Sequence, residues 1–166
     1  MDISRQIRVI ILRLANESDL PLMLAWRNHE LVRQGMYTQG FSNPHLITWQ
    51  EHLSWWKSRN KDWRTFIIEL KEDDILRPVG VVTISQLDNW NSEIGLYVGE
   101  ITLWGQKVGE RALCLALEWL RAYGCRKVHT TILKNNPSSR ALFKKMGFEE
   151  IGKAREGEIA VELYLI

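Results

Sequence analysis

The sequence predicts an α/β (α+β) domain with a mixed, largely antiparallel, twisted sheet of six to seven strands and about four helices. Short runs rich in β-branched residues alternate with amphipathic stretches, and polar turn sequences separate the strand candidates. The 166 residues, 45% of them hydrophobic, suffice for one filled core and are too few for two ordinary domains. We therefore expect residues 1–166 to form a single domain.

The composition excludes several classes of partner. The 22 basic and 20 acidic residues give a net charge of +2 and are spread without blocks, so neither nucleic acid nor an anionic membrane is an expected partner. No stretch approaches eighteen uninterrupted apolar residues. Cys114 and Cys125 have no zinc-type spacing, so we expect reduced thiols, no metal and a cytoplasmic location.

The N-terminal third combines one strand with two helices. Residues 7–14 are rich in β-formers and predict a first strand. Ser18 or Asp19 caps the helix that follows. Residues 28–47 show no clear period and predict a loop with room for one helical turn, of the kind that often carries binding groups. A capping box at residues 48–51 opens a second helix.

The middle of the chain reads as antiparallel strands. Residues 63–70 and 79–85 predict two strands joined across a polar turn at residues 71–74. Residues 93–99 predict a third strand. Apolar residues alternate with polar ones along it, so its two faces should differ in environment.

A long helix and a short helix occupy the C-terminal half. The long helix carries an apolar stripe at three- and four-residue spacing: Ala112, Leu113, Ala116, Leu117, Leu120 and Tyr123. Residues 127–133 predict a strand. In the short helix Asn136 is the expected N-cap, Pro137 the first residue and Gly147 the terminating C′ residue. Residues 149–166 predict two strands around a turn at Gly157.

The loop between the third strand and the long helix is a candidate anion site. Residues 104–109 (WGQKVG) lie where several backbone N–H groups of a helix N-terminus lack internal partners. The helix end adds about half a positive charge, and glycines allow close approach of a phosphate. Lys107 and Arg111 add cations. The alternative is an ordinary turn that needs glycines for positive φ.

The loop and the motif NNPSSRALFKKMGF at residues 135–148 together resemble the GNAT family of N-acetyltransferases over nearly the whole chain. The resemblance implies an acetyl-CoA cofactor whose diphosphate binds this loop. It also implies that the pantetheine arm pairs with a splayed strand, which would be residues 93–99 running on to Leu103. The cofactor-binding residues that it implies are Ile101, Leu103, Trp104, Gly105, Gln106, Lys107, Val108, Gly109, Asn136 and Phe143.

Glu93 is the candidate catalytic base. A typical alkyl amine with a pKa near ~10.4 is mostly protonated at neutral pH, so a base that acts through water assists its attack. The alternation along residues 93–99 puts Glu93 and Tyr97 on the face opposite Ile94. The competing interpretation is a solvent-facing glutamate on an amphipathic strand.

The sequence departs from the family pattern at two positions. Many members carry a tyrosine that protonates the leaving thiolate where this chain has Phe143, so Ser139, and after it Tyr97, is the candidate proton donor. The alternative for Ser139 is a role in capping its helix. Lys107 occupies a loop position that is usually glycine. A lysine there keeps the backbone farther from the cofactor phosphate but adds a side chain that can contact it.

Five short segments lie in the N-terminal third: WRN at 26–28, VR at 32–33, MY at 36–37, TWQEHL at 48–53 and WW at 55–56. Together they resemble the branch of GNAT enzymes that acetylates the 4-amino group of UDP-linked 4-amino-4,6-dideoxy sugars, and they make Arg33 an alternative to Arg27 at the pyrophosphate. This likeness implies a nucleotide-sugar acceptor, with aromatic and methionine side chains at the base and deoxy sugar and cations at the pyrophosphate. The expected residues are Arg27, Met36, Tyr37, His52 and Thr83. For Trp26, Trp49 and Trp56 we expect core packing.

Two other functions stay open at this point. The ribosomal-protein branch of the family acetylates protein N-termini and also tends to lack the tyrosine, and an acidic groove would favour it. A catalytically silent acyl-CoA-binding module is compatible with Phe143 and Lys107. In each case the cofactor would be acetyl-CoA, and the assignment allows a homodimer.

Overall fold

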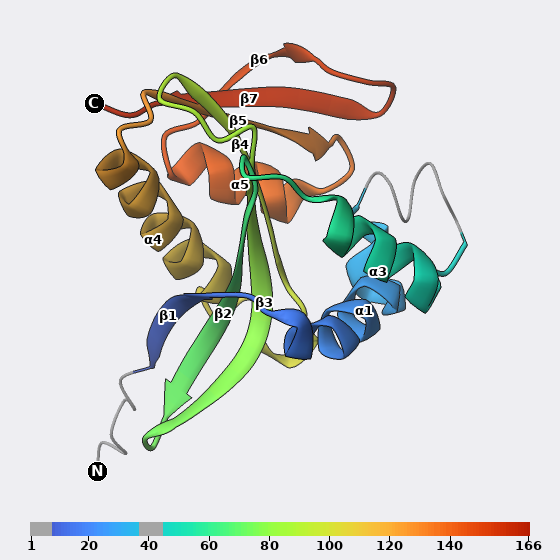
Figure 1. Ribbon diagram of the computed structural model, residues 1–166. Coiled ribbons are helices and arrows are strands. Elements are labelled where there is room, and N and C mark those ends of the chain that lie inside the picture. Colours follow the sequence, from blue (N-terminus) through green and yellow to red (C-terminus); the bar gives the residue numbers. More distant parts are fainter. Residues whose placement is uncertain (1–7, 37–44) are drawn as a thin grey trace.

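The computed structural model describes residues 8–36 and 45–166. Figure 1 shows a sheet flanked by helices on both faces. The strands are β1 (Val9–Leu14), β2 (Arg64–Glu72), β3 (Ile75–Ser85), β4 (Asn91–Val98), β5 (Lys127–Leu133), β6 (Glu149–Lys153) and β7 (Glu158–Tyr164). The helices are η1 (Glu17–Asp19), α1 (Leu20–Asn28), α2 (Glu30–Gln34), α3 (Trp49–Ser58), η3 (Ile101–Leu103), α4 (Val108–Tyr123) and α5 (Pro137–Lys145).

The seven strands form one sheet in the order β1-β2-β3-β4-β5-β7-β6. Every neighbouring pair is antiparallel except β4 and β5, which run parallel. The mixed, largely antiparallel fold expected from the sequence is therefore confirmed. The parallel pair requires a crossover connection, and α4 supplies it.

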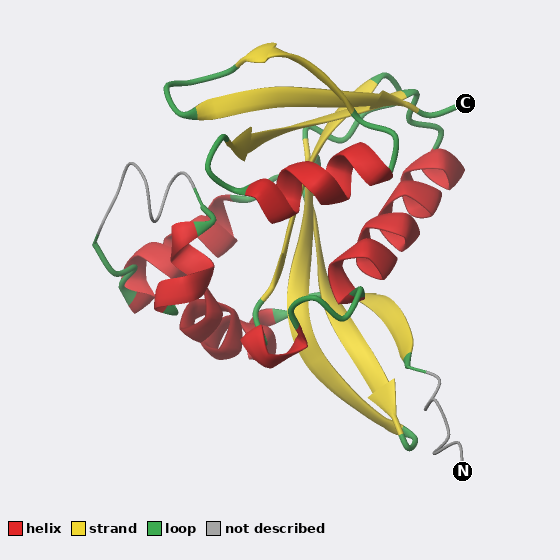
Figure 2. Cartoon of the chain, turned by 180° about the vertical axis from the view of Figure 1, so that it is seen from behind, coloured by secondary structure: helices red, strands yellow, loops and turns green. Residues whose placement is uncertain are grey.

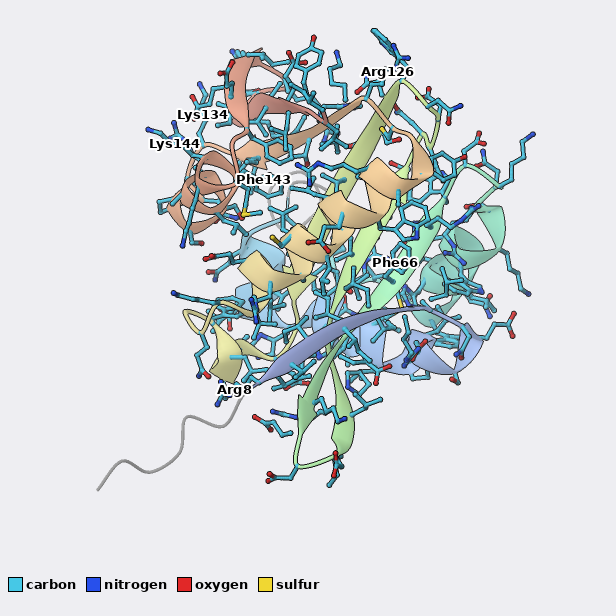
Figure 3. The ribbon with its side chains drawn as sticks, turned by 90° about the vertical axis from the view of Figure 1, so that its left-hand side faces the viewer. Arg8, Phe66, Arg126, Lys134, Phe143 and Lys144 are labelled. Atoms are coloured by element: carbon cyan, nitrogen blue, oxygen red, sulfur yellow. The ribbon has the colours of Figure 1, made fainter. Side chains whose placement is uncertain are left out.

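Each face of the sheet has its own core. On one face α4 and α5 cover a large cluster that includes Ile68, Ile94 and Leu113. Phe66 and Phe143, both labelled in Figure 3, belong to this cluster. On the other face α1 and α3 cover a smaller cluster around Met23 and Trp26, and Figure 2 shows this division from behind. Both faces of β4 are thus enclosed, which makes its side chains candidates for a site.

β4 ends earlier than the sequence suggested. The expected continuation of the strand to Leu103 is wrong: β4 stops at Val98, and Ile101–Leu103 is a 3-10 turn. The cause is a bulge, because the N–H groups of Gly99 and Glu100 both donate to Val79 O, at 2.8 and 3.2 Å. Trp26 packs so closely on Gly99 that an added Cβ would lie 2.2 Å from its ring.

β3 begins earlier than expected and continues through Pro78. A register shift opposite Ile68 and Glu69 leaves Val79 as an extra residue, and such a bulge accommodates a proline within a sheet. The preceding turn is tight, with positive φ at Asp73 and Asp74.

Two expectations about helical residues can also be checked. Trp26 is buried as expected, but Trp49, at the first turn of α3, is 43% exposed and does not belong to the core.

None of the helices in residues 8–36 and 45–166 has the length and apolar content of a transmembrane span.

Candidate active site

The sheet opens between β4 and β5. Only three residue pairs join these strands, from Asn91↔Lys127 to Glu93↔His129, after which β5 continues to pair with β7 alone. The remainder of β4, from Ile94 to Val98, therefore borders a gap. The splayed strand implied by the family resemblance is present.

The pairing of β4 with β3 determines which backbone N–H and C=O groups of β4 point into this gap. Gly99 N–H bonds to Val79 O, and hydrogen-bonded pairs alternate along an antiparallel ladder. The N–H and C=O groups of Leu96 and Val98 therefore point away from β3 and into the gap. Trp104 confirms this direction for Val98, since its indole Nε1 donates to Val98 O at 2.8 Å.

A large cavity lies at this gap. Its volume is about 680 Å³, and it is lined by α2, the end of β4, the loop before α4, the start of α4 and α5. Among the expected cofactor-binding residues it includes Leu103, Trp104, Gly105, Lys107, Val108, Gly109, Asn136 and Phe143. Ile101 and Gln106 do not line it.

The loop between β4 and α4 has two residues in the left-handed region of backbone conformation. Gly105 and Lys107 have φ of 75° and 66°, and α4 starts directly after Lys107. The N-terminus of this 16-residue helix thus opens into the larger cavity. The free edge of β4 beside it suits the amide-bearing pantetheine arm, so the residues present fit CoA.

Replacing Lys107 separates its backbone role from its charge. A left-handed conformation costs a non-glycine residue about 1 kcal/mol, so Lys107→Gly should raise the melting temperature slightly. Lys107→Met keeps the strain and removes the charge, so it should weaken CoA binding about fivefold with little change in stability. Calorimetric titration with CoA and thermal unfolding of both variants test this. CoA affinity unchanged in Lys107→Met would exclude a phosphate contact.

The smaller cavity adjoins the larger one. It measures about 340 Å³, and the residues that line both cavities include Met36, Tyr97, Asn136, Ser139 and Phe143. Arg27, Thr83 and Glu93 line the smaller cavity only. A group held in one cavity can therefore reach a group held in the other at this junction.

Glu93 lies inside the protein rather than on an open face. It is half-buried in β4, between Ser85 of β3 and His129 of β5, and it lines the smaller cavity. The interpretation of Glu93 as a simple solvent-facing residue therefore does not hold.

His52 does not contact the cavities, and its expected role at the acceptor pyrophosphate is wrong for a simple reason. The side chain is fully buried, at 0% exposure, and has no surface to offer a ligand. Its Nε2 lies 3.0 Å from Leu20 O and must donate to it, so Nδ1 carries the lone pair that accepts from Arg27 Nη1 at 3.3 Å. His52 therefore holds Arg27.

Arg27 extends into the smaller cavity from α1. Its guanidinium lies over the Trp55 ring, 5.1 Å from the centroid, and Trp55 in turn stacks on His52. Burial lowers the pKa of Arg27, and the nearby Tyr97 raises it in part. A guanidinium stays charged under these conditions, so the cavity contains an oriented cation.

The state of His52 predicts a pH dependence of stability. Burial, and then the charge of Arg27, lower the pKa of His52 below its ordinary 6.5. As the pH falls through about 6.5, the unfolded chain therefore binds a proton at His52 more readily than the folded chain does, and the free energy of unfolding falls. Denaturant titrations at pH 7 and 5.5 should show a loss about 1 kcal/mol larger for the wild type than for His52→Asn. Equal losses would mean that His52 does not titrate in this window.

Tyr97 is poorly suited to donate a proton. Its hydroxyl is buried and has no hydrogen-bond partner among residues 8–36 and 45–166. Burial raises the pKa of Tyr97 well above its ordinary 10.0, and the charge of Arg27 offsets only part of this. Transfer from such a phenol to a thiolate, whose conjugate acid has a pKa near ~8.5, is uphill. Tyr97 is better placed as a neutral hydrogen-bond donor at the junction.

Ser139 is the remaining candidate donor. The N-cap of α5 is Asn136, whose Oδ1 accepts from the backbone N of Ser139 at 3.2 Å. The Ser139 side chain makes no hydrogen bond within the described part of the chain, so it does not cap the helix. Its half-buried hydroxyl lines both cavities. Phe143, one turn later, is buried against Phe148 and offers no proton.

Only some of the other residues expected to bind the acceptor lie at the cavities. Met36 lies at the junction, whereas Tyr37 lies outside the described residues. Arg33 reaches His45 O and lines neither cavity. Sequence reasoning missed Trp63, Arg155 and Glu158, which line the smaller cavity. No local motif marks them, because they converge only through the fold.

Comparison with known proteins identifies the family to which this fold and site belong. A GNAT acetyltransferase domain model matches residues 9–149, and the chain belongs to that family. Its fold resembles that of spermidine N-acetyltransferase from Vibrio cholerae in complex with CoA and spermine, with a TM-score of 0.79 at 14% identity over 94% of this chain and 95% of that one.

More similar relatives come from Methanocaldococcus jannaschii. An uncharacterized protein of that organism is 42% identical over 158 residues, which are 94% of this chain and 31% of the relative. The chain thus spans about a third of the length of this curated relative. The crystal structure of a domain from the same organism has a TM-score of 0.88 at 40% identity, covering 95% of this chain and 99% of that one.

Proposed function

We propose that the protein transfers an acetyl group from acetyl-CoA to a primary amine of a nucleotide-linked amino sugar, most specifically its 4-amino group. The observation that carries this proposal is Arg27, a partly buried guanidinium held by His52 and Trp55 inside the acceptor-side cavity. A buried cation favours an anionic acceptor and disfavours a basic peptide or a polyamine. Trp55, Trp63 and Met36 in the same cavity suit a base and a deoxy sugar.

The chain supplies three functions at the junction. The free N–H groups of Leu96 and Val98 and the loop at the start of α4 bind and orient the cofactor. Bound acetyl-CoA supplies the acetyl group as an activated thioester. The Glu93 carboxylate accepts the proton of the acceptor amine, directly or through water. The Ser139 hydroxyl donates a hydrogen bond to the departing sulfur.

The test is thiol release from acetyl-CoA with three acceptors: a UDP-linked 4-amino sugar, an N-terminal peptide and spermidine. We expect the nucleotide sugar to react with the highest kcat/KM. Turnover restricted to the peptide would favour the ribosomal-protein type of activity and overturn the proposed acceptor. CoA binding without turnover of any amine would overturn the proposed reaction.

Two substitutions test the residue roles. Glu93→Gln should lower kcat about 100-fold, with partial recovery at high pH where more of the amine is neutral. Ser139→Ala should lower kcat about tenfold, a smaller effect because a thiolate of pKa near ~8.5 leaves without full protonation. Glu150→Gln, an exposed carboxylate paired with Arg140, is the control and should have no effect. Unchanged turnover in both test variants would remove these residues from the mechanism.

A further inference from the structure

The C-terminal hairpin supplies a second cation to the acceptor-side cavity. Arg155 lies in the turn between β6 and β7, and Glu158 is the first residue of β7. Both line the smaller cavity, to which α1 contributes Arg27. The cavity is therefore bordered by guanidinium groups from two elements that are far apart in the sequence.

Arg155 and Glu158 form an asymmetric pair. Arg155 Nε and Nη2 lie 2.8 and 2.7 Å from the same carboxylate oxygen of Glu158. The Glu158 side chain is 1% exposed, whereas that of Arg155 is 54% exposed. The carboxylate thus lies behind the guanidinium and fixes the orientation of a cation that remains accessible from the cavity.

The backbone of the turn holds the pair in place. Ala154 N donates to Glu158 O, and Glu158 N donates to Arg155 O, at 3.2 and 3.0 Å. Lys134 N, at the end of β5, donates to Gly157 O at 2.8 Å and ties the turn to the neighbouring strand. The turn therefore holds Arg155 at the wall of the smaller cavity.

We propose that Arg155 is a specificity-determining residue that binds an anionic substituent of the acceptor, a phosphate or a carboxylate, and that Glu158 is its positioning residue. This proposal rests on the proposed function and extends it, since it gives the acceptor a second anionic contact besides Arg27. Planar guanidinium groups match both anions through paired N–H donors. Substituents beyond the reacting amine would thus be recognised from the β6–β7 side.

Kinetics with matched acceptors test the proposal. For a UDP-linked amino sugar, Arg155→Gln should raise KM about 30-fold and leave kcat within twofold, and Arg155→Lys should recover part of the loss. The methyl glycoside of the same amino sugar has no anionic group, and its kinetic constants should not change. Glu158→Gln should raise KM for the nucleotide sugar by a smaller factor and leave the methyl glycoside unaffected. Arg77→Gln, an exposed arginine on the β2–β3 hairpin, is the control.

Binding without catalysis distinguishes the two proposals. UDP supplies the phosphate and glutamate supplies the carboxylate in calorimetric titrations of the wild type and Arg155→Gln. Weaker binding of either probe in the variant supports the anion contact and identifies its chemistry, even if no amino sugar is acetylated. The role of Arg155 would be overturned if the wild type and Arg155→Gln bound each probe with the same affinity. It would also be overturned if the substitution changed KM equally for the charged and the uncharged acceptor.

Discussion

Replacing Arg27 by methionine should lower kcat/KM for a nucleotide amino sugar by about two orders of magnitude. A hydrogen bond to a charged group contributes up to ~3 kcal/mol, and such a loss corresponds to roughly a 100-fold change. The loss should be large because the guanidinium is already oriented by His52 and Trp55 and needs little reorganisation to bind an anion. Steady-state thiol release at varied acceptor concentration measures it.

The controls separate acceptor recognition from folding. Arg27→Met should retain turnover of an uncharged amino sugar and should bind CoA with the affinity of the wild type, because Arg27 does not line the larger cavity. Arg77→Met removes an exposed arginine from the far hairpin and should change neither property. An equal loss with charged and uncharged acceptors would contradict a role for Arg27 in anion binding.

Gly80→Ala should destabilise the protein by about 3 kcal/mol or more and lower its melting temperature by roughly 10 °C. A Cβ at Gly80 would lie 2.4 Å from Tyr97 O and 3.0 Å from the Cα of Val98. Both are backbone atoms of β4, so the strand itself must move. Because β3 and β4 are paired at this point, the shift would also disturb the free edge of β4.

Gly95 provides the matched control for Gly80. It lies on β4 opposite Thr83, and a Cβ there meets no atom within 4 Å. Gly95→Ala should therefore be neutral or slightly stabilising, since alanine reduces the entropy of the unfolded chain. Thermal unfolding of the two variants side by side makes the comparison. Equal melting temperatures would show that the β3–β4 contact yields without cost.

Local chemistry made part of the fold predictable. Asn136, Pro137 and Gly147 mark the limits of α5, and the structure has Asn136 as N-cap, Pro137 as first residue and Gly147 with φ of 94°. The capping box at Thr48 and Glu51 likewise starts α3. Such signals act within a few residues, so a single sequence displays them.

Long-range contacts decided the remainder. The end of β4 depends on a bulge shared with Val79 and on the Trp26 ring, neither of which is adjacent in the sequence. His52 looked like a ligand contact, yet its partner Leu20 lies 32 residues away and places it in the core. Arg155 joins the acceptor side only because β7 pairs with β5. Local sequence patterns do not reveal such contacts, because the residues involved are far apart along the chain.

The central claim is that main-chain amides at the start of α4 hold the CoA diphosphate while the edge of β4 holds the pantetheine arm. The most direct test is to follow backbone amide chemical shifts during titration with CoA and, separately, with pantetheine. We predict that CoA shifts the amides of Gly105 to Gly109 together with those of Leu96 and Val98, and that pantetheine shifts only the β4 pair. Shifts from CoA that spare the loop would contradict the claim.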